Sequence, residues 1–221
     1  MAHSYLFAND LQAWTQYLAN RPENALFRLA EQEYVAALLS LVYGQYRNAF
    51  KGLRLVLELL VQGTYLSANL IELNEWLRSS KDTNWSILIG AQQEAGTEES
   101  SAAARGPFTK RFSEAFFPEI RDHAPSFATM ARTLYRELSE TIHGNMPKEI
   151  PLPPSFEFDA DTFHLWHAKA GIARMIALFC LTCRYAVQMD EASRSSVEAG
   201  VVDQLGHIEA IRTLFGGPPT V

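Results

Sequence analysis

Two side chains that could act on a phosphate group, Arg136 and His143, lie seven residues apart in one amphipathic segment. At about 100° per residue, the spacing of the apolar residues predicts a helix over residues 126–143. Its apolar side chains share one arc that we expect to face the core: Phe127, Met130, Ala131, Leu134, Tyr135, Leu138 and Ile142. The opposite side is a polar stripe that meets either water or another molecule: Arg132, Arg136, Ser139, Glu140 and His143.

The simplest interpretation of this stripe is a solvated face, on which Arg136 and Glu140 form an ordinary i,i+4 ion pair. His143 favours a functional interpretation, because in a last helical turn the negative end of the helix dipole would stabilise its imidazolium form. Arg136 and His143 would then be separated by roughly 10 Å of helical rise. One phosphate cannot easily touch both within one chain, so we expect a dimer in which the two residues come from different copies.

The run Tyr135-Arg136-Glu137-Leu138-Ser139-Glu140-Thr141-Ile142-His143-Gly144 resembles the motif of the HEPN superfamily, in which an arginine is followed by four to six residues and a histidine. The family consists of small α-helical domains, and many members are metal-independent ribonucleases of toxin and antiphage systems. The segments Tyr46-Arg47-Asn48-Ala49-Phe50 and Leu53-Arg54-Leu55-Val56-Leu57-Glu58 look like the family's long helical pair. The likeness covers about residues 31–143. One departure is Glu137, because nuclease members usually carry Asn, Asp or His after the motif arginine.

The resemblance implies a metal-independent endoribonuclease, a toxin or antiphage defence effector, with a composite active site at a homodimer interface and no cofactor. His143 would act as the general base on a ribose 2′-hydroxyl, and Arg136 would hold the phosphate as charge develops. Glu137, Ser139 and Glu140 would be supporting groups at most. RNA would be the substrate, and an antitoxin or another defence-system protein could be a partner. The alternative is a catalytically inactive HEPN-like helical module that binds a protein partner through the same stripe.

The elements that must position this segment are expected to be helices, because helical periodicity recurs along the chain and alternating strand patterns are nearly absent. We expect an all-α, single-domain helical bundle over residues 1–221, with a long antiparallel hairpin whose two helices meet at Gly44. The hairpin helices should end near Tyr43 and begin near Gln45. Other helices are expected over residues 9–18 with Asn9-Asp10 as cap, 71–78, 109–120, 161–189 and 192–215, while residues 85–89 could be helical or extended.

Two segments are expected to be irregular. Residues 91–107 are rich in Gln, Glu, Ser, Ala and Gly without apolar anchors, which predicts a mobile loop. Residues 147–158 are proline-rich and should form a surface connection.

Composition limits the partners that the chain can have. A net charge of -6 opposes broad attraction to nucleic acid, so any RNA contact must be local. Arg105, Lys110, Arg111 and Arg121 could form such a patch, although solvated charge is the simpler interpretation. The longest apolar runs, near Leu55 to Val61, are shorter than a bilayer span, and the first residues lack an export signal. We therefore expect a cytoplasmic protein with no membrane partner.

Two further clusters could bind a metal in principle. Cys180 and Cys183 could be half of a zinc site, but no second cysteine pair completes it, and we expect small buried residues. His164 and His167, with Asp159 and Asp161 nearby, could hold a divalent cation. The adjacent aromatic residues favour instead the start of a core helix capped by Asp161. The sequence therefore gives no metal site that we expect to be occupied.

Overall fold

The computed structural model describes residues 2–80, 85–89, 106–142, 148–153 and 155–218, and within these ranges it contains helices and no strand. The α-helices are α1 (Ala2–Tyr17), α2 (Asn24–Val42), α3 (Tyr46–Leu66), α4 (Leu70–Leu77), α5 (Trp85–Leu88), α7 (Lys110–Phe116), α8 (Ala124–Ser139), α9 (Ala160–Tyr185), α10 (Glu191–Leu205) and α11 (Glu209–Leu214). Short 3-10 helices cover Pro118–Ile120 and Ala186–Gln188. The all-α prediction is thus confirmed for the described chain, and the ambiguous residues 85–89 contain the helix α5.

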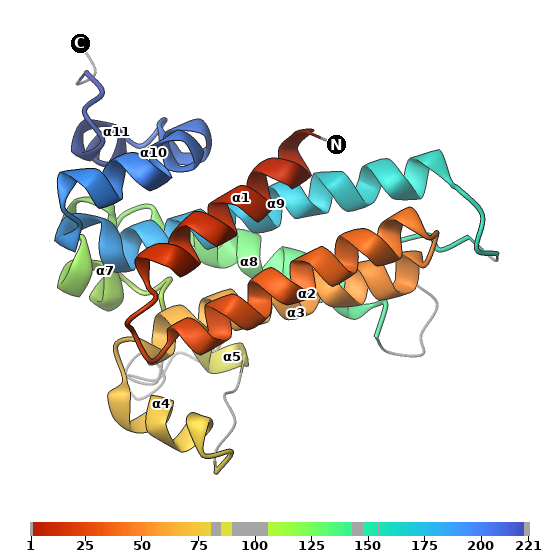
Figure 1. Ribbon diagram of the computed structural model, residues 1–221, viewed down its shortest axis with the longest axis horizontal. Coiled ribbons are helices and arrows are strands. Elements are labelled where there is room, and N and C mark those ends of the chain that lie inside the picture. The colour runs from red at the N-terminus through yellow and green to blue at the C-terminus, as the bar shows by residue number, and fades with distance from the viewer. Residues whose placement is uncertain (1, 81–84, 90–105, 143–147, 154, 219–221) are drawn as a thin grey trace.

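The helices α2 and α3 run side by side along the length of the molecule (Figure 1). Their connection turns at Gly44, whose φ of +70° lies in the left-handed region that favours glycine. Gly52 on α3 faces Ala37 on α2, and a Cβ added to Gly52 would lie 2.8 Å from the Ala37 Cβ. The absence of a side chain at Gly52 therefore allows the close approach of the two backbones.

This contact gives a prediction about stability. We expect Gly52→Ala to lower the free energy of unfolding by about 1–3 kcal/mol, because the new methyl group forces α2 and α3 apart. Gly171→Ala on α9 is the matched control, since a Cβ there meets nothing within 4 Å. That control should stabilise by up to about 1 kcal/mol through helix propensity alone. Urea unfolding curves measure both, and equal effects of the two substitutions would contradict the close-packing account.

The helix α9 is the centre of the core, packing against α1, α3, α7, α8 and α10. Trp166 and Phe179 on this helix are fully buried, and the Phe179 ring stacks on Phe127 of α8 with centroids 3.9 Å apart. Residues Ala160–Gln188 are long and apolar enough to cross a membrane by length and composition, which the short apolar runs of the sequence did not indicate. The window that meets this criterion is 78% buried inside the protein, as in a core helix.

The expected cap at Asn9-Asp10 is wrong, because α1 begins at Ala2 and contains Asp10 in its middle. The Asp10 carboxylate accepts a hydrogen bond of 2.6 Å from Nε of Arg174, a residue of α9 that is only 2% exposed. Asp203 of α10 accepts from Nη1 of the same guanidinium at 2.7 Å. A buried cation thus joins α1, α9 and α10.

The expected helix over residues 126–143 is too long, because α8 ends at Ser139. The last residues tighten into i,i+3 turns, in which the Thr141 amide donates to the Leu138 carbonyl. The Ser139 and Thr141 hydroxyls also donate to carbonyls of the preceding turn. As a result Ile142, expected on the buried arc, is 39% exposed. Phe127, Ala131, Leu134 and Leu138 are buried as expected, while Met130 and Tyr135 are half-buried.

Other boundaries also differ from the expected ones. The helix expected over residues 109–120 is divided at Phe117, before Pro118, and the one over residues 192–215 is divided between Leu205 and Glu209. In the surface connection 147–158, Ile150 is completely buried. Most of the expected loop 91–107 lies outside the described residues, but Gly106 and Pro107 at its end are buried.

Candidate functional site

Arg136 lies in the last turn of α8, where its cation is favoured by the negative end of the helix dipole. Its side chain is exposed, as the helical wheel predicts, and it makes no hydrogen bond or ion pair with the part of the chain that the structure describes. Arg136 is close enough to the Glu140 carboxylate to lower its pKa, although other contacts contribute more. The guanidinium therefore remains available to an external anion.

His143 lies outside the described residues, so the geometry between Arg136 and His143 stays a prediction. The described residues on both sides of it are held by specific contacts. Before it, the Thr141 carbonyl accepts a hydrogen bond of 2.9 Å from Nη1 of Arg47 on α3. After it, the backbone amides of Lys148 and Glu149 donate to the Glu140 carboxylate at 2.8 and 3.0 Å. Thr141, Lys148 and Glu149, which are described, are thus held close to the end of α8.

The three expected supporting residues have structural partners. Glu137 pairs with Lys169 of α9 at 2.7 Å, with both side chains about 15% exposed. Ser139 accepts a hydrogen bond of 3.1 Å from Nε of Arg54 on α3, and Glu140 holds the two amides described above. These contacts fix the end of α8 against its neighbours. Of the four candidate residues that the structure describes, Arg136 is therefore the one whose side chain has no partner among the described residues.

A network of side chains that was not predicted from the sequence connects α3 with α8. Arg54 donates to the hydroxyl of Tyr135, lies over its ring at 4.3 Å and pairs with Glu58 at 3.1 Å. Trp85 of α5 stacks on the same ring with centroids 4.0 Å apart. Burial, followed by the Glu58 carboxylate, raises the pKa of Tyr135, so the phenol stays neutral. The i,i+4 spacing of Arg54 and Glu58 is visible in the sequence, but their partner on α8 is not.

The Glu140 contacts give a pH-dependent prediction. Hydrogen bonds from Glu149 and Lys148 lower the pKa of the Glu140 carboxyl from its ordinary 4.5. A lowered pKa in the folded state means that the contact is fully present above pH 4.5 and is lost as pH falls through the folded value. We expect the amide resonances of Lys148 and Glu149 to titrate together below pH 4.5 in an NMR experiment. In Glu140→Ala both resonances should lose this titration; if they keep it, another carboxyl holds them.

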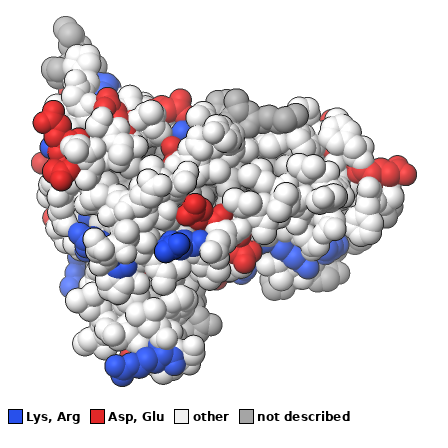
Figure 2. All heavy atoms as spheres, in the orientation of Figure 1, with Lys and Arg blue, Asp and Glu red and all other residues white. Residues whose placement is uncertain are grey.

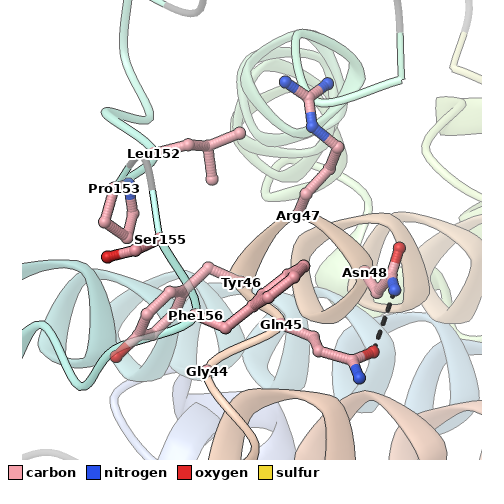
Figure 3. A pocket seen from close by; sticks show the side chains of 9 residues that line it. All are labelled: Gly44, Gln45, Tyr46, Arg47, Asn48, Leu152, Pro153, Ser155 and Phe156. Atoms are coloured by element: carbon pink, nitrogen blue, oxygen red, sulfur yellow. Dashed lines mark hydrogen bonds between the residues drawn. The ribbon is translucent and has the colours of Figure 1, made fainter.

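A pocket of about 450 Å³ is lined in part by Arg47, the residue that binds the Thr141 carbonyl just after α8. Figure 3 shows the residues that line this pocket. The pocket is formed between the start of α3 and the segment that precedes α9. In Figure 3 the Arg47 guanidinium points away from Gln45 and Asn48, whose amides are joined by a hydrogen bond of 3.0 Å. The described residues that line the pocket are Gly44, Gln45, Tyr46, Arg47, Asn48, Leu152, Pro153, Ser155 and Phe156.

The other clusters considered in the sequence have structural explanations. Cys180 and Cys183 are free and fully buried, as expected. His167 is hydrogen-bonded to Ser4 of α1, and burial lowers its pKa, while His164 is exposed. The carboxylate that caps α9 is Asp159, which accepts from the Thr162 amide at 2.7 Å, and not the expected Asp161. No three metal-ligating side chains gather anywhere in the described ranges.

The expected basic patch is partly neutralised. Lys110 lies 3.4 Å from Asp122, and Arg121 lies 3.8 Å from Glu114 and 3.9 Å from Asp122. Figure 2 shows small groups of Lys and Arg atoms separated by uncharged surface and acidic groups on the face in view. Any binding of nucleic acid to this face must therefore use local contacts.

Comparison of the chain with known proteins gave no match among the protein families, among the curated proteins or among the solved structures. The likeness to HEPN domains thus depends on the residues quoted from the sequence.

Proposed function

We propose that this protein is a metal-independent endoribonuclease of HEPN type, with a composite active site at a homodimer interface. The proposal includes a HEPN-like arrangement of the hairpin α2–α3 with α8, and a cytoplasmic role as a toxin or antiphage defence effector. An antitoxin or another defence-system protein would be its regulatory partner.

The observation that carries this proposal is that the Arg136 guanidinium, at the end of α8, has no partner among the described residues. Glu137, Ser139 and Glu140 around it bind other parts of the protein, whereas the exposed Arg136 guanidinium has no such partner among the described residues. A helix end held this firmly, with one free guanidinium, suits a group that must hold a phosphate in a fixed place.

The proposed reaction is an internal transesterification of RNA. His143 removes the proton of a ribose 2′-hydroxyl, and the 2′-oxygen forms a bond to the adjacent phosphorus. The bond from phosphorus to the 5′-oxygen of the next nucleotide breaks, and that oxygen takes up a proton. Arg136 of the other copy stabilises the charge on the phosphate oxygens during this step. The products are a 2′,3′-cyclic phosphate and a 5′-hydroxyl.

The composite site requires a dimer. We expect light scattering at micromolar concentration to give twice the mass of 24.8 kDa. Mixing inactive Arg136→Ala protein with inactive His143→Ala protein should restore part of the activity, because one of the two mixed sites keeps both residues. A monomeric protein that cleaves RNA would contradict the composite site.

One observation favours the second candidate, a catalytically inactive helical module that binds a protein partner, with the binding face on α2 in place of the expected polar stripe on α8. The helix α2 exposes Val35, Leu39 and Val42, at 47%, 56% and 75%, with the i,i+4,i+7 spacing of one helix face. Apolar side chains in such a row are typical of a protein interface. An inactive protein that forms a complex through this face would support this alternative.

A further inference from the structure

The pocket beside the start of α3 has a lining suited to a nucleotide. Among the described residues that line the pocket, Arg47 is the one with a charged side chain, so this part of the wall carries a positive charge. Gln45 and Asn48 add amide groups, and Phe156 adds an aromatic ring. A cation, hydrogen-bonding amides and an aromatic face match a phosphate, the edge of a base and the face of a base, respectively.

These groups still have unused binding capacity. Arg47 donates one hydrogen bond to the Thr141 carbonyl, and a guanidinium has five N–H donors. Asn48 donates to Oε1 of Gln45, which leaves Nε2 of Gln45 as a donor and Oδ1 of Asn48 as an acceptor. The Phe156 side chain is 83% exposed, so a large apolar ring faces water in the free protein. A planar ligand that stacks on Phe156 would remove this surface from water.

The pocket wall is fixed by its contacts with the rest of the protein. Tyr46 is 2% exposed, and its hydroxyl donates to the Asp159 carbonyl and accepts from the Asp159 amide at 3.1 and 2.7 Å. A Cβ at Gly44 would lie 3.1 Å from the Phe156 carbonyl, so the turn and the segment before α9 are in close contact. The start of α3 and the segment that bears Phe156 are therefore held together on both sides of the pocket.

The pocket is also joined to the end of α8. Arg47 lines the pocket and binds the carbonyl of Thr141, two residues before His143 and five residues after Arg136. The pocket and the end of α8 are therefore in direct contact through Arg47. A volume of about 450 Å³ is within the range of roughly 300–1,000 Å³ found for small-ligand sites.

We propose that this pocket binds one unpaired nucleotide of a single-stranded RNA, adjacent to the position at which that strand is cleaved. The inference rests on the proposed ribonuclease function and assigns its substrate class. The base stacks on Phe156, its edge meets Gln45 and Asn48, and a neighbouring phosphate meets Arg47. A base inside a duplex has both faces covered by its neighbours, so a duplex offers no base to Phe156.

Binding can be measured separately from cleavage. The probe is a fluorescein-labelled single-stranded 2′-O-methyl RNA, which lacks the free 2′-hydroxyl that the reaction needs, and the readout is fluorescence anisotropy with the full-length protein. Phe156→Ala should weaken binding by about five- to a hundredfold, as expected for the loss of one stacked base. Phe158→Ala is the matched control, because Phe158 is also exposed, at 73%, and does not line the pocket. Arg47→Gln should lower the dependence of log affinity on log salt by about one.

The same probe annealed to its complement, and free adenosine monophosphate as competitor, test the substrate class. Duplex binding should be insensitive to Phe156→Ala, and the mononucleotide should bind far more weakly than the strand. Equal binding of Phe156→Ala and Phe158→Ala, or equal affinity for strand and mononucleotide, would overturn the assignment. If the wild type binds the strand as expected but leaves unmodified RNA intact, the ribonuclease function and the position next to a cleavage site are wrong, while the binding of an unpaired nucleotide in the pocket stands. If the wild type cleaves RNA while Phe156→Ala binds the probe with wild-type affinity, the pocket assignment is wrong and the ribonuclease function stands.

Discussion

Alanine at Arg136 or at His143 is expected to lower the rate of RNA cleavage by about a hundred- to ten-thousandfold. A positioned general base and a charged donor on the phosphate each contribute on this scale. Arg136 is exposed and has no partner among the described residues, so its removal opens no cavity and leaves no buried group unsatisfied. The free energy of unfolding of Arg136→Ala should therefore change by about 0.5 kcal/mol or less.

Arg28→Ala is the matched control, because Arg28 is an exposed arginine on α2 and has no place in the proposed site. Its cleavage rate should equal that of the wild type. Full activity of Arg136→Ala or of His143→Ala would remove the proposed roles. A large loss of stability in Arg136→Ala would instead indicate that the end of α8 is a structural or partner-binding surface.

Replacing Arg174 with methionine is expected to lower the free energy of unfolding by about 3–5 kcal/mol at pH 7. The guanidinium is 2% exposed and neutralises Asp10, whose side chain is 13% exposed. Methionine fills similar space but leaves the Asp10 carboxylate without its cation. Burial already raises the pKa of Asp10 in the wild type, and Arg174 opposes this rise.

The loss of stability in Arg174→Met should depend on pH. Without the cation, the pKa of Asp10 in the folded state rises further above its unfolded value, so the variant gains stability relative to the wild type as Asp10 becomes protonated. The difference between variant and wild type should be largest at neutral pH and smaller near pH 4. Arg121→Met is the control, since its ion pairs are about half exposed and should contribute less than about 1 kcal/mol. A loss at Arg174 no larger than at Arg121 would contradict the role of the buried cation.

Helix positions were largely predictable from periodicity, because the apolar arc of α8 and the long apolar face of α9 are local properties of the sequence. The position at which α8 ends was not predictable from periodicity. It depends on Arg47, which is 94 residues before Thr141 and binds its carbonyl, and on Glu140, which binds amides of Lys148 and Glu149. Such contacts between distant residues have no local signal.

The same reason explains the errors at single residues. Asp10 follows an asparagine and has the residue type of a helix cap, but its partner Arg174 is 164 residues away. Glu137 and Ser139 were candidates for supporting roles because they lie beside Arg136, and only the fold shows that they pair with Lys169 and Arg54. The exposure of Arg136 was predictable, since it follows from its angle on the helix relative to Leu134 and Leu138.

The most direct test of the proposed function is the product of the reaction with single-stranded RNA in the presence of EDTA. We predict that the purified protein cleaves the strand at an undiminished rate with the chelator and leaves a 2′,3′-cyclic phosphate and a 5′-hydroxyl. His143→Ala, purified in the same way, should leave the strand intact, which excludes a contaminating nuclease. An intact strand with the wild-type protein, or cleavage that EDTA abolishes, would contradict a metal-independent ribonuclease.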